Sequence, residues 1–148
     1  MEKYKKLNTD FIDKKLEKEK IQIIAYHDKE YPSLLRQIAN PPYILYLKGK
    51  IPEPPCFAVI GSRNISAYGK KCIEYIVPAL AEHMTIVSGG AFGCDSLAHE
   101  ITLKHAGNTL IIIGTGIDKI YPATNASLYK KVLENDSGIL SIFPLGEP

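Results

Sequence analysis

The second part of the chain has a regular pattern in which apolar runs alternate with segments of helical composition. The runs CFAVIGS, MTIVSGG and NTLIIIGTG are rich in β-branched residues and each contains a glycine near its end, and GILSIFP at 138–144 is a fourth run. Helical segments at about 67–83, 94–106 and 126–136 lie between them. Apolar strands that alternate with helices are typical of a parallel sheet with helices on both faces. We therefore predict an α/β, Rossmann-like fold.

The first part of the chain is less regular and begins with a highly charged segment. We predict a helix within residues 1–20, then a strand at 21–28, a short helix at 31–38 and a second strand at 41–49. The helix has capping groups at Asn8, Thr9 and Asp10 and an apolar stripe of Phe11, Ile12 and Leu16.

A proline-rich segment divides these two parts. The three prolines of IPEPP, at 51–55, cannot continue a helix or a central strand. We therefore expect a small α/β lead-in at residues 1–50 and a Rossmann-like domain at 51–148.

The predicted strands place glycine-containing turns together. Ligands of parallel sheets bind beyond the carboxyl ends of the strands. Those ends are Gly61-Ser62-Arg63, Ser88-Gly89-Gly90 and Gly114-Thr115-Gly116. Glycine lets backbone N–H groups approach an anion, and a following helix N-terminus adds partial positive charge. This edge is therefore a candidate phosphate-binding site, although glycine also serves simply to close a tight turn.

Arg63 is unusual because arginine is rare in this chain. The chain has 18 lysines and arginines, of which only Arg36 and Arg63 are arginines. The planar guanidinium suits a phosphate group, so an arginine at a strand-to-helix turn favours a specific contact. An ordinary surface arginine is the alternative.

Several common site types do not fit the motifs. The dinucleotide fingerprint G-x-G-x-x-G is absent after Gly61, and no Walker-type phosphate loop is present. Ser88, Asp95 and His99 lack the context of a nucleophile elbow, so we expect Asp95 to stabilise a helix start with His99 packed behind it. The cysteines Cys56, Cys72 and Cys94 form no metal-binding spacing. We expect no cofactor, no metal and no catalysis.

Composition changes this picture little. The chain has 148 residues, 45% hydrophobic and 23% charged, with a net charge of +2. This charge is too small to indicate nucleic acid by itself. No apolar run approaches the length of about 18 residues that a membrane helix needs. We expect a cytoplasmic protein without a membrane partner.

Four motifs, in order, resemble the DNA-processing protein A (DprA/Smf) family. They are GSRNISAYG, IVSGGAFGCDSLAH, TLIIIGTGIDKIYPATNASL and SIFPLGEP, and the upstream HDKEYPSLLRQIANPPYILYLKG resembles the lead-in of that family. The resemblance implies a non-catalytic, single-stranded DNA-binding protein of natural transformation that passes DNA to the RecA recombinase. It also implies a homodimer in a longer form, because the family domain continues past the end of this chain.

The resemblance and the glycine turns give one candidate set of nucleic-acid-binding residues, with Arg63 on the DNA backbone. The set is Gly61, Ser62, Arg63, Ser66, Ser88, Gly89, Gly90, Gly114, Lys119 and Tyr121. Tyr68, Tyr121 and Tyr129 are candidates for stacking on unpaired bases.

Two positions depart from the family pattern, and two other functions remain open. Ile142 stands where the family usually has glutamate, and Cys94 stands where an aliphatic residue is common. The alternatives are a sensor of a small nucleotide-derived ligand and a nucleotide phosphoribohydrolase of the lysine-decarboxylase-like (LOG) type. GTGIDKIYP lacks the glutamate of the phosphoribohydrolase signature, which counts against the second.

Overall fold

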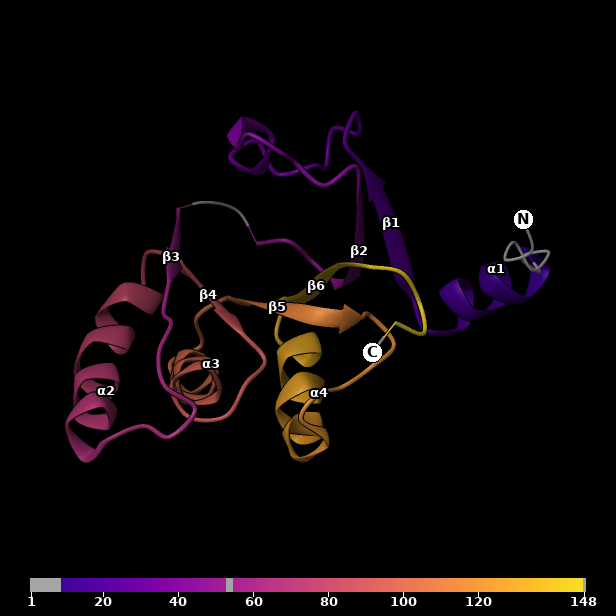
Figure 1. Ribbon diagram of the computed structural model, residues 1–148. Coiled ribbons are helices and arrows are strands. Elements are labelled where there is room, and N and C mark those ends of the chain that lie inside the picture. The colour runs from indigo at the N-terminus through magenta and orange to yellow at the C-terminus, as the bar shows by residue number, and fades with distance from the viewer. Residues whose placement is uncertain (1–8, 53–54, 148) are drawn as a thin grey trace.

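The computed structural model describes residues 9–52 and 55–147 and contains one sheet with helices packed on it (Figure 1). The strands are β1 (Ile21–Ala25), β2 (Ile44–Gly49), β3 (Cys56–Ala58), β4 (Thr85–Gly89), β5 (Thr109–Gly116) and β6 (Gly138–Phe143). The α-helices are α1 (Thr9–Lys18), α2 (Ala67–Ala81), α3 (Cys94–Lys104) and α4 (Ala126–Glu134). Two short 3-10 helices, η1 (Leu35–Gln37) and η2 (Ala123–Asn125), complete the elements.

The six strands form a mixed sheet in the order β1-β2-β6-β5-β4-β3. Strands β3 to β6 are parallel to one another, as the alternation of apolar runs and helices predicts. The lead-in strands are antiparallel, because β1 pairs with β2 and β2 pairs with β6. The α/β class is therefore confirmed, with the lead-in strands joined to the parallel sheet rather than separate from it.

The crossover helices lie together on one face of the sheet. The strands β3, β4, β5 and β6 are neighbours in chain order, so each right-handed crossover steps in the same direction. As a result α2, α3 and α4 lie on the same side in Figure 1. This differs from the expectation of helices on both faces.

The two faces of the sheet have separate hydrophobic cores. On the helix side, Ile86 packs against α2 and α3, and Ile111 and Ile139 pack against α4. On the opposite side, the lead-in covers Leu110 and Leu140. Leu45 and Leu47 of β2 continue this face, and Tyr26, Tyr31 and Leu35 pack against it.

The segment at 31–38 is not the predicted helix. It contains turns and η1, and the side chain of Arg36 holds it against the end of β1. Arg36 donates from Nε to the carbonyl oxygen of Tyr26 at 3.2 Å and from Nη2 to that of Asp28. Its guanidinium also lies 5.4 Å from the ring centroid of Tyr31. These contacts and the following Pro41 and Pro42 favour a compact loop over a continuous helix.

The other predicted elements are present with small shifts at their ends. The helix expected within residues 1–20 is α1, and its Leu16 packs against the core beside α4. Asn8 lies outside the described residues, as do the side chains of Thr9, Asp10 and Phe11. The boundary predicted near residue 50 stays a prediction. No helix in the described ranges is long and apolar enough to cross a bilayer.

Candidate functional site

A cleft of about 350 Å³ lies at the carboxyl edge of the parallel strands. This volume falls in the range of about 300–1,000 Å³ that is usual for ligand clefts. The lining residues come from the loop after β3, from the end of β4, from the second half of β5, from the loops that follow these two strands, and from the start of α3. They are Arg63, Gly89, Gly90, Ala91, Phe92, Asp95, Ile112, Ile113, Gly114, Thr115, Tyr121 and Pro122.

The loop that carries Arg63 is fixed on the start of α3 by close backbone contacts. The carbonyl oxygen of Ser62 accepts a hydrogen bond from the N–H of Cys94 at 3.1 Å. Gly93 has a φ of 77°, and a side chain there would overlap the carbonyl oxygens of Ser62 and Arg63. A side chain at Gly61 would likewise overlap Cys94. The glycines therefore allow the contact that sets Arg63 at the lip of the cleft.

The two arginines of the chain differ in what they bind. Arg36 is engaged within the lead-in, as described above. The guanidinium of Arg63 is exposed and has no hydrogen bond or ion pair with any residue in the described ranges. Arg63 is therefore available to a ligand. An unpaired, exposed guanidinium is consistent with a phosphate contact and not with a role in holding the fold together.

Two residues fix the turn after β4: Asn125, which immediately precedes α4, and Tyr129 within α4. Asn125 donates from Nδ2 to the carbonyl oxygen of Gly90 at 3.0 Å. A side chain at Gly90 would overlap the hydroxyl of Tyr129, which donates to the carbonyl oxygen of Tyr121 at 3.3 Å. These contacts connect the loops after β4 and β5 and so fix two walls of the cleft.

His99 links β4 and β5 beneath the same turn. Its Nε2 lies 2.9 Å from the carbonyl oxygen of Gly89, so Nε2 carries the hydrogen. Its Nδ1 lies 2.6 Å from the hydroxyl of Thr109, which also lies 2.7 Å from the carbonyl oxygen of Ile86. Burial lowers the pKa of His99, although the bond to Gly89 and the charge of Asp95 oppose this. The ring is therefore neutral and structural at pH 7.

Asp95, in the first turn of α3, places its carboxylate against Gly89. A side chain at Gly89 would lie about 2.5 Å from Oδ2 of Asp95, so the carboxylate occupies the space that glycine leaves. Burial and the charge of Asp95 raise the pKa of Tyr129 to about 12. The cleft therefore contains a negative group in its wall as well as the positive group of Arg63.

The third wall is the end of β5 and the loop after it. A side chain at Gly114 would meet no atom within 4 Å, so the backbone there faces open space. Tyr121 is 64% exposed and Phe92 is 47% exposed, and both line the cleft. Each therefore presents an aromatic ring to a ligand.

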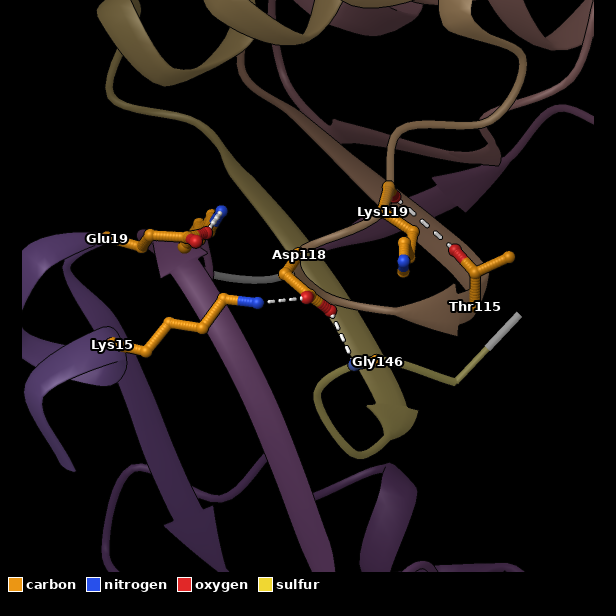
Figure 2. A network of polar contacts seen from close by, with 7 residues as sticks. Lys15, Glu19, Thr115, Asp118, Lys119 and Gly146 are labelled. Carbon is orange, nitrogen blue, oxygen red and sulfur yellow. Dashed lines mark hydrogen bonds and ion pairs between the residues drawn. The ribbon is translucent and has the colours of Figure 1, made fainter. Parts of the chain in front are cut away.

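A polar network behind the cleft ties this loop to both ends of the described chain (Figure 2). Asp118 binds the ammonium of Lys15 from α1 and accepts a hydrogen bond from the N–H of Gly146 at 2.8 Å. Burial by itself raises the pKa of Asp118, but the bonds from Lys15 and Gly146 hold it below its ordinary value. The hydroxyl of Thr115 donates to the carbonyl oxygen of Lys119 at 3.4 Å, which closes the turn.

The structure brings part of the predicted set to the cleft. Arg63, Gly89, Gly90, Gly114 and Tyr121 line it. The other predicted residues, Gly61, Ser62, Ser66, Ser88 and Lys119, do not. Gly61 and Ser62 shape the Arg63 loop, and Lys119 is exposed on the turn after β5.

Two of the predicted serines are engaged elsewhere. Ser88 is buried and donates to the carbonyl oxygen of Val59 at 2.5 Å. Ser66 caps α2 by accepting a bond from the N–H of Gly69 at 3.1 Å. Of the stacking candidates, Tyr129 is only 2% exposed, so it cannot stack on a base, whereas Tyr68 is exposed but does not line the cleft.

The sequence reasoning missed Asp95, Phe92 and Asn125 as parts of the site. The expected role of Asp95 was to stabilise the start of α3, and no local pattern distinguishes that role from a place in the cleft wall. The hypothetical group of Ser88, Asp95 and His99 does not form a triad, because the side chains of Ser88 and His99 bind other partners. Within the described ranges, no set of side chains is grouped to hold a metal ion.

Comparison with known families decides where the chain belongs. A family model described as DNA recombination-mediator protein A matches residues 22–148. The chain belongs to the DNA recombination-mediator protein A family. The resemblance that four motifs predicted is thereby confirmed.

Curated relatives in this family are longer than the chain. A DNA processing protein DprA of Streptococcus pneumoniae is 36% identical over an alignment of 149 positions, which covers 99% of this chain and 52% of that protein. A protein Smf of Synechocystis is 35% identical over 132 residues, covering 84% of this chain and 33% of its own. The chain therefore spans about half, or less, of the relatives it matches.

Solved structures of the family share the fold. The X-ray structure of the Streptococcus pneumoniae DNA processing protein A has a TM-score of 0.80 at 37% identity, over 92% of this chain and 49% of that one. A Helicobacter pylori DNA processing protein A, described for its single-stranded DNA binding mode, has a TM-score of 0.74 at 27% identity. That match covers 86% of this chain and 58% of the other. The Rossmann-like class is confirmed.

Proposed function

We propose that the cleft binds single-stranded DNA and that Arg63 contacts its phosphate backbone. The observation that carries this proposal is the exposed guanidinium of Arg63, without a partner in the described part of the chain, at the lip of the cleft. Arginine is well suited to phosphate, and backbone contacts supply much of the affinity for nucleic acids. The single-stranded DNA binding mode described for the Helicobacter pylori relative supports the same ligand.

A single strand suits the cleft better than a duplex. Phe92 and Tyr121 are exposed and line the cleft from two different loops. Aromatic rings stack on unpaired bases, whereas the bases of a duplex are already stacked on one another. Lys119, exposed and without an ion pair among the described residues, adds positive charge near Tyr121.

The role we propose is non-catalytic and lies in DNA recombination. The family description, a recombination mediator, supports the transfer of bound single-stranded DNA to the RecA recombinase during natural transformation. A homodimer in a longer form and a cytoplasmic location belong to the same proposal. A filament-assembly assay tests the RecA step. The chain should speed RecA loading on single strands that are covered by a single-strand-binding protein, and an unchanged rate would contradict it.

Fluorescence anisotropy across a salt series tests the DNA proposal. The ligands are labelled oligo-dT, matched duplex DNA and free nucleotides. The proteins are the wild type, Arg63→Ala and Lys104→Ala, which removes one positive charge from the far end of α3. We expect saturable binding of oligo-dT that Arg63→Ala weakens and Lys104→Ala does not. The salt slope should fall by about 0.7 for the lost phosphate contact.

Two outcomes would contradict single-stranded DNA binding. Equal affinity for the duplex would show that unpaired bases contribute nothing. Binding of free nucleotides alone would favour the sensor of a small nucleotide-derived ligand. The phosphoribohydrolase alternative is not favoured, because the turn after β5 lacks its glutamate.

A further inference from the structure

Asp118 lies at the centre of the polar network behind the cleft, and its carboxylate joins the loop after β5 to two other segments. The side chain is only 6% exposed. Its Oδ2 accepts from the ammonium of Lys15 in α1, and its Oδ1 accepts from the N–H of Gly146 at 2.8 Å. Figure 2 shows that the two donors reach the carboxylate from different sides. One side chain therefore holds both α1 and the turn after β6 against this loop.

The same loop carries two residues that the proposed function uses. Lys119 follows Asp118 directly, and Tyr121 lies two residues further along and lines the cleft. On the other side of Asp118, Ile117 is 3% exposed and packs in the core beside α4. The loop is thus anchored inward at Ile117 and Asp118, whereas Lys119 and Tyr121 are exposed. The positions of the exposed residues depend on these anchors.

Two further hydrogen bonds of this loop are local and do not tie it to another element. The N–H of Lys119 donates to the carbonyl oxygen of Gly116 at 2.8 Å, and the hydroxyl of Thr115 donates to that of Lys119 at 3.4 Å. Asp118, in contrast, joins the loop to α1 by a bond between two charged groups, which is stronger than a bond between neutral ones. Loss of this bond would leave Lys119 with more freedom.

We propose that Asp118 is a positioning residue for single-stranded DNA, and that its ion pair with Lys15 couples the docking of α1 to the affinity for the strand. This inference rests on the proposed function, in which Lys119 and Tyr121 contribute to binding. A loop that is ordered beforehand loses less conformational entropy when it binds. Coupling between two sites is reciprocal, so the bound strand should in turn hold α1 more firmly.

The ion pair can be broken without detaching α1. Leu16 packs against the core beside α4, and Glu19 pairs with Lys48 at 2.6 Å. These contacts keep the helix on the sheet when the bond to Asp118 is lost. A change in DNA binding then reports the position of the loop rather than unfolding of the chain.

The test measures the anisotropy of labelled oligo-dT with the wild type, Asp118→Asn, Lys15→Ala and Lys15→Arg. Lys15→Arg retains a cation that can pair with Asp118. The controls are Asp136→Asn and Lys50→Ala, which remove the same charges from an exposed ion pair, with side chains 77% and 66% exposed. Urea unfolding of each variant confirms that it is folded under the conditions of binding.

The two halves of the pair change the charge in opposite directions. Asp118→Asn removes a negative charge, which by electrostatics alone would strengthen binding to DNA, whereas Lys15→Ala removes a positive one. We expect both to weaken oligo-dT binding by about three- to tenfold, because both release the loop. Their combination should be no weaker than either alone. Lys15→Arg and the two controls should stay within about twofold of the wild type.

Hydrogen exchange tests the reciprocal effect. The backbone amides of α1 should exchange more slowly when oligo-dT saturates the wild type. This slowing should be absent in Lys15→Ala and retained in Lys50→Ala. A purely structural ion pair would stabilise α1 equally with and without the strand.

Each contrary result has a distinct meaning. Stronger binding by Asp118→Asn would show that charge alone acts here, and it would overturn the coupling while the proposed function stands. Unchanged exchange of α1 on saturation with oligo-dT would do the same. Failure of the wild type to bind oligo-dT would overturn the proposed function, and the inference with it. If Asp118→Asn does not fold, the comparison of Lys15→Ala with Lys15→Arg decides, and equal affinities of those two variants would overturn the coupling.

Discussion

Gly93 lies with its α-carbon against the carbonyl group of Ser62, with a φ of 77° that L-residues rarely adopt. The N–H of the next residue, Cys94, donates to that same carbonyl oxygen. The position of Arg63 thus depends on Gly93, which lies 30 residues further along the sequence.

Replacement of Gly93 by alanine should disturb both stability and binding. The backbone conformation alone costs a non-glycine residue about 1–3 kcal/mol, and overlap with the carbonyl oxygens of Ser62 and Arg63 adds to this. We expect Gly93→Ala to lower the free energy of unfolding in urea by at least this amount and to weaken oligo-dT binding. A variant with wild-type stability would show that the loop and α3 separate easily.

Gly114→Ala should separate binding from stability. Its new side chain would meet no atom within 4 Å, and Gly114 has no positive φ. We expect the free energy of unfolding to change by less than about 0.5 kcal/mol. Because Gly114 lines the cleft, oligo-dT affinity should fall. Unchanged affinity would mean that the ligand stays away from the end of β5.

Protonation of His99 should destabilise the fold below neutral pH. Its pKa is lowered in the folded state from the ordinary value of 6.5, so the unfolded chain binds the proton more readily. The contribution of the neutral ring to the free energy of unfolding is therefore fully present above pH 6.5, and it is lost as the pH falls below that value.

A pH series of urea unfolding measures this loss. His99→Gln should be less stable than the wild type at pH 7.5 but should vary less with pH between about 6.5 and 5, where one proton changes stability by up to about 1.4 kcal/mol per pH unit. His83→Gln, at an exposed position, is the control and should keep the wild-type slope. Parallel curves for the wild type and His99→Gln would contradict the prediction.

The ion pair of Lys15 with Asp118 should contribute more to stability than the exposed pair of Lys50 with Asp136. The side chain of Asp118 is 6% exposed and that of Asp136 is 77% exposed. We expect Asp118→Asn to lower the free energy of unfolding by about 1–2 kcal/mol and Asp136→Asn by less than about 0.5 kcal/mol. Equal effects would show that α1 docks without this contact.

The same pair has a defined acid dependence. The pKa of Asp118 is lowered in the folded state from its ordinary value of 3.8. The contribution of the ion pair to the free energy of unfolding is therefore fully present above pH 3.8 and is lost as the pH falls through the lower pKa of the folded state. The difference between the wild type and Asp118→Asn should therefore shrink only in strong acid. A difference that disappears already near pH 6 would contradict the assignment.

Asn125→Ala should loosen the turn after β4. It removes the donor to the carbonyl oxygens of Gly90 and Ala91, at 3.0 and 3.5 Å, which should lower the free energy of unfolding by about 1–2 kcal/mol. Asn135→Ala removes a similar bond, to Gly107 at 3.1 Å, from a residue that does not line the cleft. Only Asn125→Ala should also weaken oligo-dT binding. Equal affinities of the two variants would separate the turn from the site.

The sequence pattern predicts the parallel strands well because their signal is local. MTIVSGG and NTLIIIGTG are apolar on both sides of the strand, and that composition suits a strand whose two faces are both covered. CFAVIGS has the same composition but forms the edge strand β3, whose residues are exposed. The edge that carries Arg63 follows directly, since the carboxyl ends of parallel strands meet at one edge.

The remaining features depend on contacts between distant residues, which no local pattern encodes. The antiparallel pairing of β2 with β6 joins Tyr46 to Ser141. Ser88 and Tyr129 occupy motif and helix positions that look accessible, but both side chains are buried in the folded chain. In the sequence Asp95 is an ordinary residue at the start of a helix, and only its contact with Gly89 in the folded chain places it in the wall of the cleft.

The lead-in does more than precede the parallel strands. The crossover helices all lie on one face, so Leu110 and Leu140 on the other face depend on Tyr26, Tyr31 and Leu35 to exclude water. A truncated protein that starts after Gly49 would expose the inner side of its own sheet. Without β2, the strand β6 would also become a free edge open to pairing with other molecules. We therefore expect the parallel strands to aggregate when they are produced without the lead-in.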